Sequence, residues 1–223
     1  MISFYRHNEG VKTDYVIELL ESGKNLALVS DAGTPGISDP GEDLVKEAIE
    51  HNINVVPVPG AVAFIQGLIA SGFDTTRFVF EGFLSINKRA RRERLEYLKR
   101  ETRTMIFYEA PHKLKRTIQD LYDAFGGERK IVLARELTKI HETVMRTSLK
   151  GAIDYFEVEN PRGEYVLIIA GAEKQKEKQP VTLEQAVEIA KELVNKGMSV
   201  NDASKAVAAD TGIKKSVIYK ELL

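Results

Sequence analysis

Cysteine is absent from the 223 residues of the sequence. A disulfide framework, a thiolate metal site and a catalytic thiol are therefore excluded, and the composition suits a reducing compartment. The sequence has no run of about eighteen apolar residues, so it predicts no membrane-spanning helix. It also has no basic N-terminal segment followed by an apolar core, which a signal peptide would need. We therefore expect a cytoplasmic protein with no membrane partner.

The sequence also lacks an excess of charge of either sign. The sequence has 32 Lys and Arg residues against 33 Asp and Glu residues, which gives a formal net charge of -1. Proteins that coat nucleic acid nonspecifically are usually more basic, so a polyanionic partner would have to be bound by a local patch. Hydrophobic residues make up 43% of the chain, enough for one large core or two modest ones.

Strand and helix signals alternate from the start of the chain. The apolar runs "NLALV" (Asn25–Val29) and "NVVPV" (Asn54–Val58) predict strands, and helices are predicted over residues 42–52 and 61–71. Strands that are apolar on both faces and alternate with helices are typical of a parallel sheet covered by helices on each side.

A second set of strand and helix signals begins near Thr75. Its last three strands carry little helix between them, apart from a short piece around residues 152–156, so we expect antiparallel pairs mixed with parallel ones. The predicted strands are residues 77–84, 104–110, 130–137, 142–147 and 163–171, and the predicted helices are 88–101 and 111–125.

The last fifty residues differ in character from the rest. "AEKQKEKQP" (172–180) is polar and ends in proline, which indicates a linker. Beyond it, Thr182 with Gln185 forms a capping box, Ser199 offers a second cap, and Gly197 and Gly212 offer helix stops. The predicted organisation is an incomplete N-terminal α/β domain at 1–74, a second α/β domain at 75–172, a linker at 173–181 and a helical module at 182–223.

The loop "SDAGTPGISDPG" (30–41) directly follows the first predicted strand. Loops at the carboxyl ends of parallel strands face the crevice where open α/β sheets bind ligands. Asp39 is predicted as the N-cap of the next helix, with Pro40 at its first position. The first half, "SDAGTPG", is not needed to start a helix, and its glycines allow close backbone approach. It predicts a preorganised ligand cradle; the alternative is a structural loop without a ligand.

A similar loop, "PVPGAVA" (57–63), follows the second predicted strand. Its small residues leave room for a flat group beside the backbone, or else serve close helix–strand packing. The sequence has neither G-x-G-x-x-G after a strand nor G-x-x-x-x-G-K-[ST], so neither loop is a standard dinucleotide or phosphate loop. No cluster of Lys or Arg surrounds the first loop, which therefore suits a neutral or cationic ligand.

Six passages follow one another along the chain. They are "LVSDAGTPGISDPG", "VPVPGAVAF", "FEGFL", "IFYEAPHKL", "LARELTKIHE" and "GEYVLIIAG". Together they resemble the tetrapyrrole methylase superfamily, and within it the 16S ribosomal RNA cytidine 2′-O-methyltransferases. The helical tail resembles the C-terminal extension of that branch. The resemblance begins partway into the first domain. We therefore expect a sheet without its first strand, an incomplete donor pocket, and weak activity or none from this form.

The resemblance implies two α/β domains that bind S-adenosylmethionine between them, in a protein expected to be a homodimer. Its implied reaction is methyl transfer to a ribose 2′-hydroxyl of 16S ribosomal RNA in the small ribosomal subunit, with no metal expected. The implied cofactor-binding residues are Asp31, Ala32, Gly33, Thr34, Pro35, Pro59, Gly60, Ala61, Tyr108, Glu109, Ala110, Ala134, Arg135 and Glu136.

No catalytic base is identified from the sequence. Glu109 follows an apolar strand, where it either accepts the ribose proton or, as we favour, belongs to a structural ion pair. Arg135 and Glu136 are further candidates, with Lys139 beside them. Tyr108 either stacks on adenine or, as we favour, only packs at the end of a core strand.

The helix predicted from residue 88 carries the candidate RNA contacts. They would bind phosphates in a salt-dependent manner, or else form the i,i+4 ion pairs of a solvated helix. The tail resembles a helix-turn-helix, and a three-helix packing module explains it nearly as well. Other functions left open are methylation of a tetrapyrrole-like small molecule and non-enzymatic nucleic-acid binding. The candidate RNA contacts are Lys88, Arg89, Arg91, Arg92 and Arg94.

Overall fold

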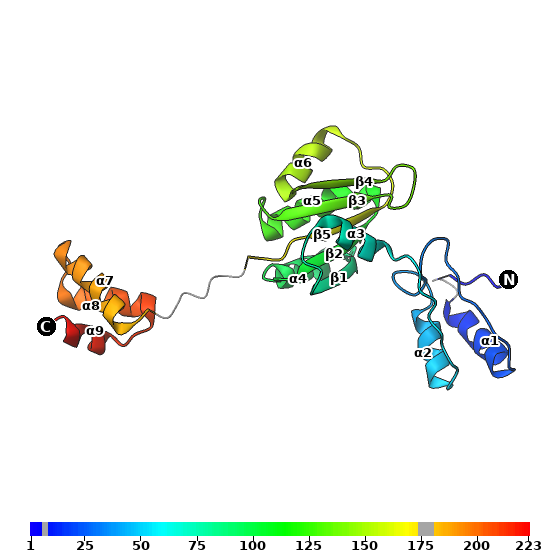
Figure 1. Ribbon diagram of the computed structural model, residues 1–223, viewed down its shortest axis with the longest axis horizontal. Helices are drawn as coiled ribbons and strands as arrows, with labels where there is room; N and C mark the ends of the chain where they lie inside the picture. The colour runs from blue at the N-terminus through cyan, green and yellow to red at the C-terminus, as the bar shows by residue number, and fades with distance from the viewer. Residues whose placement is uncertain (6–8, 174–180) are drawn as a thin grey trace. The chain divides into compact units, whose positions relative to one another are not determined.

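The computed structural model describes residues 1–5, 9–173 and 181–223. The chain divides into two compact units, Met1–Ala172 and Glu173–Leu223 (Figure 1). Most of the predicted linker at 173–181 lies outside the described residues. None of the described helices has the length and apolar character needed to cross a bilayer.

The first unit contains a mixed five-stranded sheet in the order β1-β2-β5-β3-β4. β1 runs parallel to β2, while the pairs β2–β5, β5–β3 and β3–β4 are antiparallel. The predicted mixed sheet of the second half is thereby confirmed. Because β1, β2 and β3 run in the same direction, their last residues lie at one edge, called here the carboxyl edge. The strands are β1 Phe78–Phe83, β2 Thr104–Glu109, β3 Lys130–Arg135, β4 Thr143–Ser148 and β5 Tyr165–Ile169.

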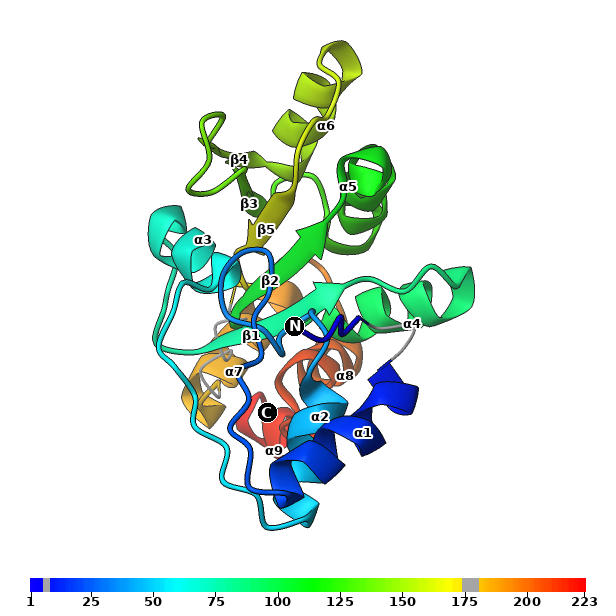
Figure 2. The same cartoon turned by 90° about the vertical axis from the view of Figure 1, so that its right-hand side faces the viewer.

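Helices cover both faces of this sheet. Figure 2 shows α3 (Ala63–Ser71) on one side and α4 (Lys88–Leu98), α5 (Pro111–Phe125) and α6 (Leu149–Val158) on the other. Side chains of a strand alternate between faces, so β2 contributes Met105 and Phe107 to the core under α4–α6, and Ile106 to the core under α3.

Helix α3 lies close against the sheet because Gly67 has no side chain. A Cβ on Gly67 would stand 3.0 Å from Cγ1 of Val166 in β5. The predicted domain boundary between residues 74 and 75 assigns α3 to the first domain, yet α3 packs on the sheet formed by the second. That contact brings the loop preceding α3 to the carboxyl edge.

Helices α1 (Glu9–Glu21), which was not predicted, and α2 (Glu42–Glu50) lie side by side (Figure 1). His51, after α2, links them: its Nδ1 lies 2.7 Å from Oε1 of Glu21 and its Nε2 lies 3.4 Å from Oε1 of Glu47. The hydrogen bond to Glu21, together with the charge of Glu47, raises the pKa of His51.

Two predicted strands are not formed. Residues 25–29 and 54–58 have no regular secondary structure, and Val29, Val56 and Val58 are 77%, 71% and 79% exposed. A strand needs a hydrogen-bonded neighbour, and neither segment has one among the residues that the structure describes. Their apolar pattern therefore indicated strands that this fold does not pair.

The predicted N-cap of α2 is also wrong. The helix begins at Glu42, and its N-cap is Gly41 rather than Asp39. Gly41 has a φ of 129°, a conformation that glycine alone adopts readily, and this stops the helix from starting two residues earlier.

The second unit consists of α7 (Leu183–Asn195), α8 (Val200–Thr211) and α9 (Lys215–Glu221) around a small apolar core. Thr182 and Gln185 form the predicted capping box, and Ser199 caps α8 as predicted. Gly212 ends α8 with a φ of 74°. These local signals were sufficient because each involves residues only a few positions apart.

Candidate functional site

The two glycine- and proline-containing loops touch each other. The backbone N–H of Thr34 donates to the carbonyl oxygen of Ala61 at 3.0 Å, and its hydroxyl donates to the same oxygen at 3.3 Å. Gly33 has a φ of +77°, and a Cβ there would lie 2.8 Å from that oxygen. A Cβ on Gly60 would lie 3.0 Å from Oγ1 of Thr34. The loops 31–35 and 59–61, called here the loop pair, thus approach too closely for side chains at these two glycines.

Tyr108 connects the end of β2 to the first turn of α3. Its hydroxyl accepts a hydrogen bond of 3.1 Å from the backbone N–H of Phe64, three residues after the loop pair. Burial raises the pKa of Tyr108, and the charge of Asp39 acts in the same direction against the hydrogen bond from Phe64. The half-exposed ring of Phe83 lies 5.6 Å from the Tyr108 ring. Asp39 and Phe83 therefore also lie near Tyr108, although neither was predicted as a site residue from the sequence.

Strand alternation separates the predicted second-domain residues into two groups. Tyr108 and Ala134 both stand opposite Val166 and pack on the α3 side, where the loop pair lies. Glu109 and Arg135 both stand opposite Tyr165 and face the α4–α6 side. The side chains of Glu109 and Arg135 therefore face away from the side of the sheet on which the loop pair lies, and their predicted place in the cofactor site stays a prediction.

Glu109 is held in a buried polar network. Its carboxylate accepts a short hydrogen bond from the Thr117 hydroxyl and one of 2.9 Å from the backbone N–H of Ala110, the N-cap residue of α5. Nη2 of Arg91 donates to the Thr117 hydroxyl at 2.8 Å, and Nε of Arg91 donates to Asp120 at 2.5 Å. Glu109 is thus hydrogen-bonded within the fold, with Thr117 between it and the arginine, and its role in the site stays a prediction.

Glu136 holds the loop after β3. Oε1 of Glu136 accepts hydrogen bonds from the backbone N–H of Glu164 at 2.8 Å and from Nζ of Lys139 at 3.1 Å. The hydrogen bond from Glu164, followed by that from Lys139, lowers the pKa of Glu136. A carboxylate stabilised in its charged form by two donors is a structural anchor and a poor proton acceptor.

Most of the predicted RNA-binding cations of helix α4 pair with carboxylates of this protein. Arg89 pairs with Glu93 at 2.8 Å, and Arg94 forms two hydrogen bonds of 2.7 Å with Glu81. Arg91 is only 6% exposed and is hydrogen-bonded to Asp120 and Thr117, so its burial argues against the predicted contact with RNA, which stays a prediction. Lys88 and Arg92 have no ion-pair partner within the described ranges.

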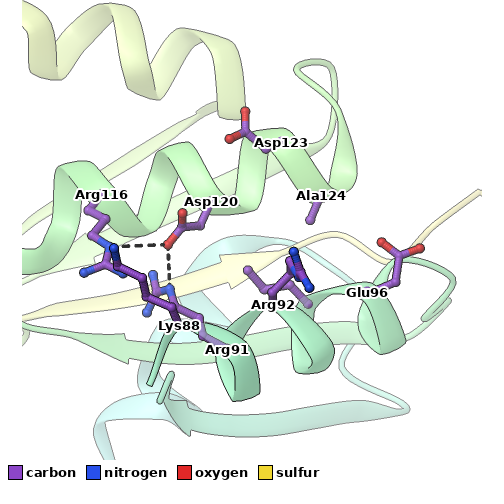
Figure 3. A pocket seen from close by; sticks show the side chains of 9 residues that line it. Lys88, Arg91, Arg92, Glu96, Arg116, Asp120, Asp123 and Ala124 are labelled. Carbon is purple, nitrogen blue, oxygen red and sulfur yellow. Dashed lines mark hydrogen bonds and ion pairs between the residues drawn. The ribbon is translucent and has the colours of Figure 1, made fainter. Parts of the chain in front are cut away.

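Lys88 and Arg92 line a pocket of about 490 Å³ between α4 and α5. Figure 3 shows this pocket, in which Asp120 points toward both Arg91 and Arg116. Arg116 lies 3.9 Å from Asp120 and its side chain is 56% exposed. Sequence reasoning missed Arg116, although the parallel order of β1 and β2 places α4 and α5 side by side on one face.

The tetrapyrrole (corrin/porphyrin) methylase family matches residues 4–153 of the chain. Among solved structures, the methyltransferase CobJ superposes with a TM-score of 0.57 at 20% sequence identity, covering 74% of this chain and 72% of that one. The sheet, the helices on both its faces and the loop pair therefore define an enzyme fold of the tetrapyrrole methylase class.

Two relatives narrow this class further. The ribosomal RNA small subunit methyltransferase I of Synechocystis sp. is 46% identical over 98% of this chain and 78% of its own length. The protein of that name from Haemophilus influenzae is 42% identical over 98% of this chain and 77% of its own. The chain belongs to the ribosomal RNA small subunit methyltransferase I family.

Proposed function

We propose that this chain transfers a methyl group from S-adenosylmethionine to a ribose 2′-hydroxyl of 16S ribosomal RNA. Because the chain belongs to this family, it is an S-adenosylmethionine-dependent methyltransferase of ribosomal RNA. The ribose position, the residues of the site, a homodimeric state and a cytoplasmic location are our proposals. The observation that supports this site is the close backbone approach of Gly33 to Ala61. It lies directly before α3, whose Phe64 N–H donates a hydrogen bond to the Tyr108 hydroxyl.

The loop pair suits a cationic nucleoside. Its close contacts come from main-chain groups and small residues. Asp31 belongs to the first loop, and the charge of Asp39 acts on Tyr108 beside it. We assign the donor to residues 31–35 and 59–61, with Tyr108 and Ala134 completing the site on the sheet. When bound, S-adenosylmethionine supplies a methyl group already activated by its positive sulfur.

The protein's own task is then mainly orientation. Holding two reactants in line contributes roughly 7–11 kcal/mol of barrier reduction, and a rigid cradle of stiff loops provides it. Glu109 and Glu136 are engaged elsewhere, so we propose Asp31 or Asp39 as the group that orients the ribose hydroxyl and accepts its proton.

We assign the RNA phosphates to the rim of the α4–α5 pocket, where Lys88, Arg92 and Arg116 lie. Lys88 and Arg92 keep their charge available because neither is paired within the part of the chain that the structure describes. Such contacts position RNA without reading its sequence.

The decisive experiment measures transfer of labelled methyl from S-adenosylmethionine to 30S subunits lacking the modification, with a corrin precursor as the competing acceptor. Resistance of one phosphodiester bond to alkaline hydrolysis would identify 2′-O-methylation. Label in the corrin precursor alone would overturn the RNA assignment. Binding of RNA without binding of S-adenosylmethionine would favour a non-enzymatic nucleic-acid-binding protein.

A further inference from the structure

A second pocket lies on the side of the sheet opposite the loop pair, between β3, β4 and the end of α6. Its volume is about 650 Å³, within the range of small-ligand sites. We call it the Arg135 pocket. Its polar and aromatic lining residues include Arg135, Tyr155, Phe156, Glu159, Asn160 and Arg162.

Arg135 has an unsatisfied donor here. Its Nε is buried and has no hydrogen-bond partner among the described residues. A buried guanidinium N–H without an acceptor is costly, and a ligand carrying anionic or carbonyl oxygens would satisfy it once the Arg135 side chain turns this buried group toward the pocket. Glu159 is the acidic residue lining the pocket, against the guanidinium groups of Arg135 and Arg162. The charge balance therefore favours an anion.

The other wall of the pocket is aromatic. The rings of Tyr155 and Phe156 are 5.0 Å apart and edge-on, and those of Phe156 and Tyr165 are 6.1 Å apart. Tyr155 is 48% exposed, which leaves ring surface for a ligand. Phosphate oxygens suit an arginine fork, and a flat base suits an exposed tyrosine, which together are the features that single-stranded RNA sites use.

The pocket also adjoins the basic surface assigned to RNA. Nζ of Lys115, one residue before Arg116 on α5, lies 3.4 Å from Oδ1 of Asn160. Asn160 itself lines the Arg135 pocket. An RNA strand bound along α4 and α5 would therefore have a short path to Arg162 and Arg135.

We propose that the Arg135 pocket binds one unstacked nucleotide of the RNA substrate, with its phosphate on Arg135 and its base against Tyr155. This inference rests on the proposed function and assigns Arg135 to the RNA rather than to the methyl donor. The nucleotide bound here is a neighbour of the target, because the loop pair lies across the sheet from the pocket.

The direct test follows the Nε–H resonance of Arg135 in the whole protein by NMR while ribonucleoside 5′-monophosphates are added. The Arg135→Gln variant assigns the signal, and Arg77, before β1 at the other edge of the sheet, is the control resonance. We expect the Arg135 signal to shift and the Arg77 signal to stay. No shift of the Arg135 signal up to millimolar nucleotide would overturn the proposal.

The kinetic test compares the KM for 30S subunits with the KM for S-adenosylmethionine. Loss of one charge-assisted hydrogen bond in Arg135→Gln should raise the 30S KM about tenfold and leave the donor KM unchanged. Tyr155→Leu should act in the same direction, while Arg77→Gln should change neither constant. A raised donor KM, or a dimer that dissociates on Arg135→Gln, would assign the pocket to the cofactor or to a second subunit and overturn the proposal.

The two proposals can fail separately. If 30S subunits are methylated normally by both pocket variants, the nucleotide pocket is wrong and the proposed function stands. If 30S subunits are not methylated but nucleotides still shift the Arg135 signal, the pocket stands as a nucleotide site and the proposed reaction is wrong.

Discussion

The hydroxyl of Tyr108 accepts a hydrogen bond of 3.1 Å from the backbone N–H of Phe64. This contact joins the end of β2, at the carboxyl edge of the sheet, to α3, the helix that follows the second loop. The first turn of a helix has N–H groups without partners in the helix, and Tyr108 satisfies one of them. The position of the loop pair relative to the sheet therefore depends on this hydroxyl.

Tyr108→Phe removes that acceptor and leaves the ring contacts with Phe80 and Phe83 in place. We expect a loss of about 1 kcal/mol in the free energy of unfolding and a several-fold rise in the KM for S-adenosylmethionine. The KM for 30S subunits should stay unchanged. Urea denaturation and steady-state kinetics measure both effects, and a donor KM equal to that of the wild type would separate Tyr108 from the donor site.

The loop pair offers a test with a matched control. Gly33 and Gly36 have similar φ values of +77° and +84°, so alanine at either position carries the same backbone strain, about 1 kcal/mol. Only at Gly33 would the new Cβ meet another atom, the carbonyl oxygen of Ala61 at 2.8 Å. Gly33→Ala should therefore weaken S-adenosylmethionine binding at least tenfold more than Gly36→Ala in calorimetry. Equal losses for the two variants would mean that the close approach of the loops is unimportant for the donor.

Substitution of a buried arginine of α4 should destabilise the protein more than substitution of an exposed one. Arg91→Gln leaves Asp120 and the Thr117–Glu109 pair without their buried partner, and we expect a loss of about 3–5 kcal/mol in unfolding free energy. Arg89→Gln, which breaks an exposed pair with Glu93, should cost less than about 1 kcal/mol. Thermal and urea unfolding compare the two variants. Similar stabilities would show that the buried network contributes nothing.

The unpaired cations should affect RNA binding and leave stability unchanged. Arg92→Gln and Lys88→Gln each remove one proposed phosphate contact, so each should reduce the salt dependence of binding by roughly 0.7–0.9 in log–log slope. Unfolding free energies should stay within about 0.5 kcal/mol of the wild type, as for other surface changes. Filter binding to 16S RNA fragments across a salt series provides the slope. An unchanged slope in both variants would move the RNA to another surface.

Sequence reasoning succeeded where the deciding residues are close together in the chain. Helix α5 and the caps at Thr182 and Ser199 depend on contacts over a few positions. It did not predict the burial of Arg91, which depends on Asp120, 29 residues away. It also failed for Asn25–Val29, whose apolar pattern indicates a strand only where a neighbouring strand is available.

The predicted cofactor residues illustrate the same limit. Period-two alternation places Tyr108 and Glu109 on opposite faces of β2, and this much can be read from the sequence. Which face the loop pair occupies is decided by the packing of Gly67 against Val166, a long-range contact. Which of these two side chains faces the loop pair could therefore be known only from the fold.

Glu101 provides the clearest pH-dependent contribution to stability. Hydrogen bonds from the side chain and backbone of Arg103 outweigh burial and lower the pKa of Glu101 from 4.5 to about 2. A carboxyl group whose pKa is lower in the folded state stabilises the fold above the unfolded-state pKa, and this contribution is lost as pH falls toward the folded-state value. Because Arg103 is half-exposed, solvent screening limits the contribution to about 1–2 kcal/mol.

Glu101→Gln should therefore lower the unfolding free energy by that amount at neutral pH and by progressively less between pH 4.5 and about 2. Near the lower limit most of the difference between wild type and variant should be gone, since the carboxyl group is then protonated in the unfolded state and about half protonated in the folded state. Glu93→Gln, which removes a carboxylate from an exposed ion pair on α4, is the control for loss of a surface charge and should change the unfolding free energy by less than about 1 kcal/mol at neutral pH. Urea denaturation across this pH range measures the difference. A gap between wild type and Glu101→Gln that stays constant with pH would show that the Glu101–Arg103 pair acts through packing and not through charge.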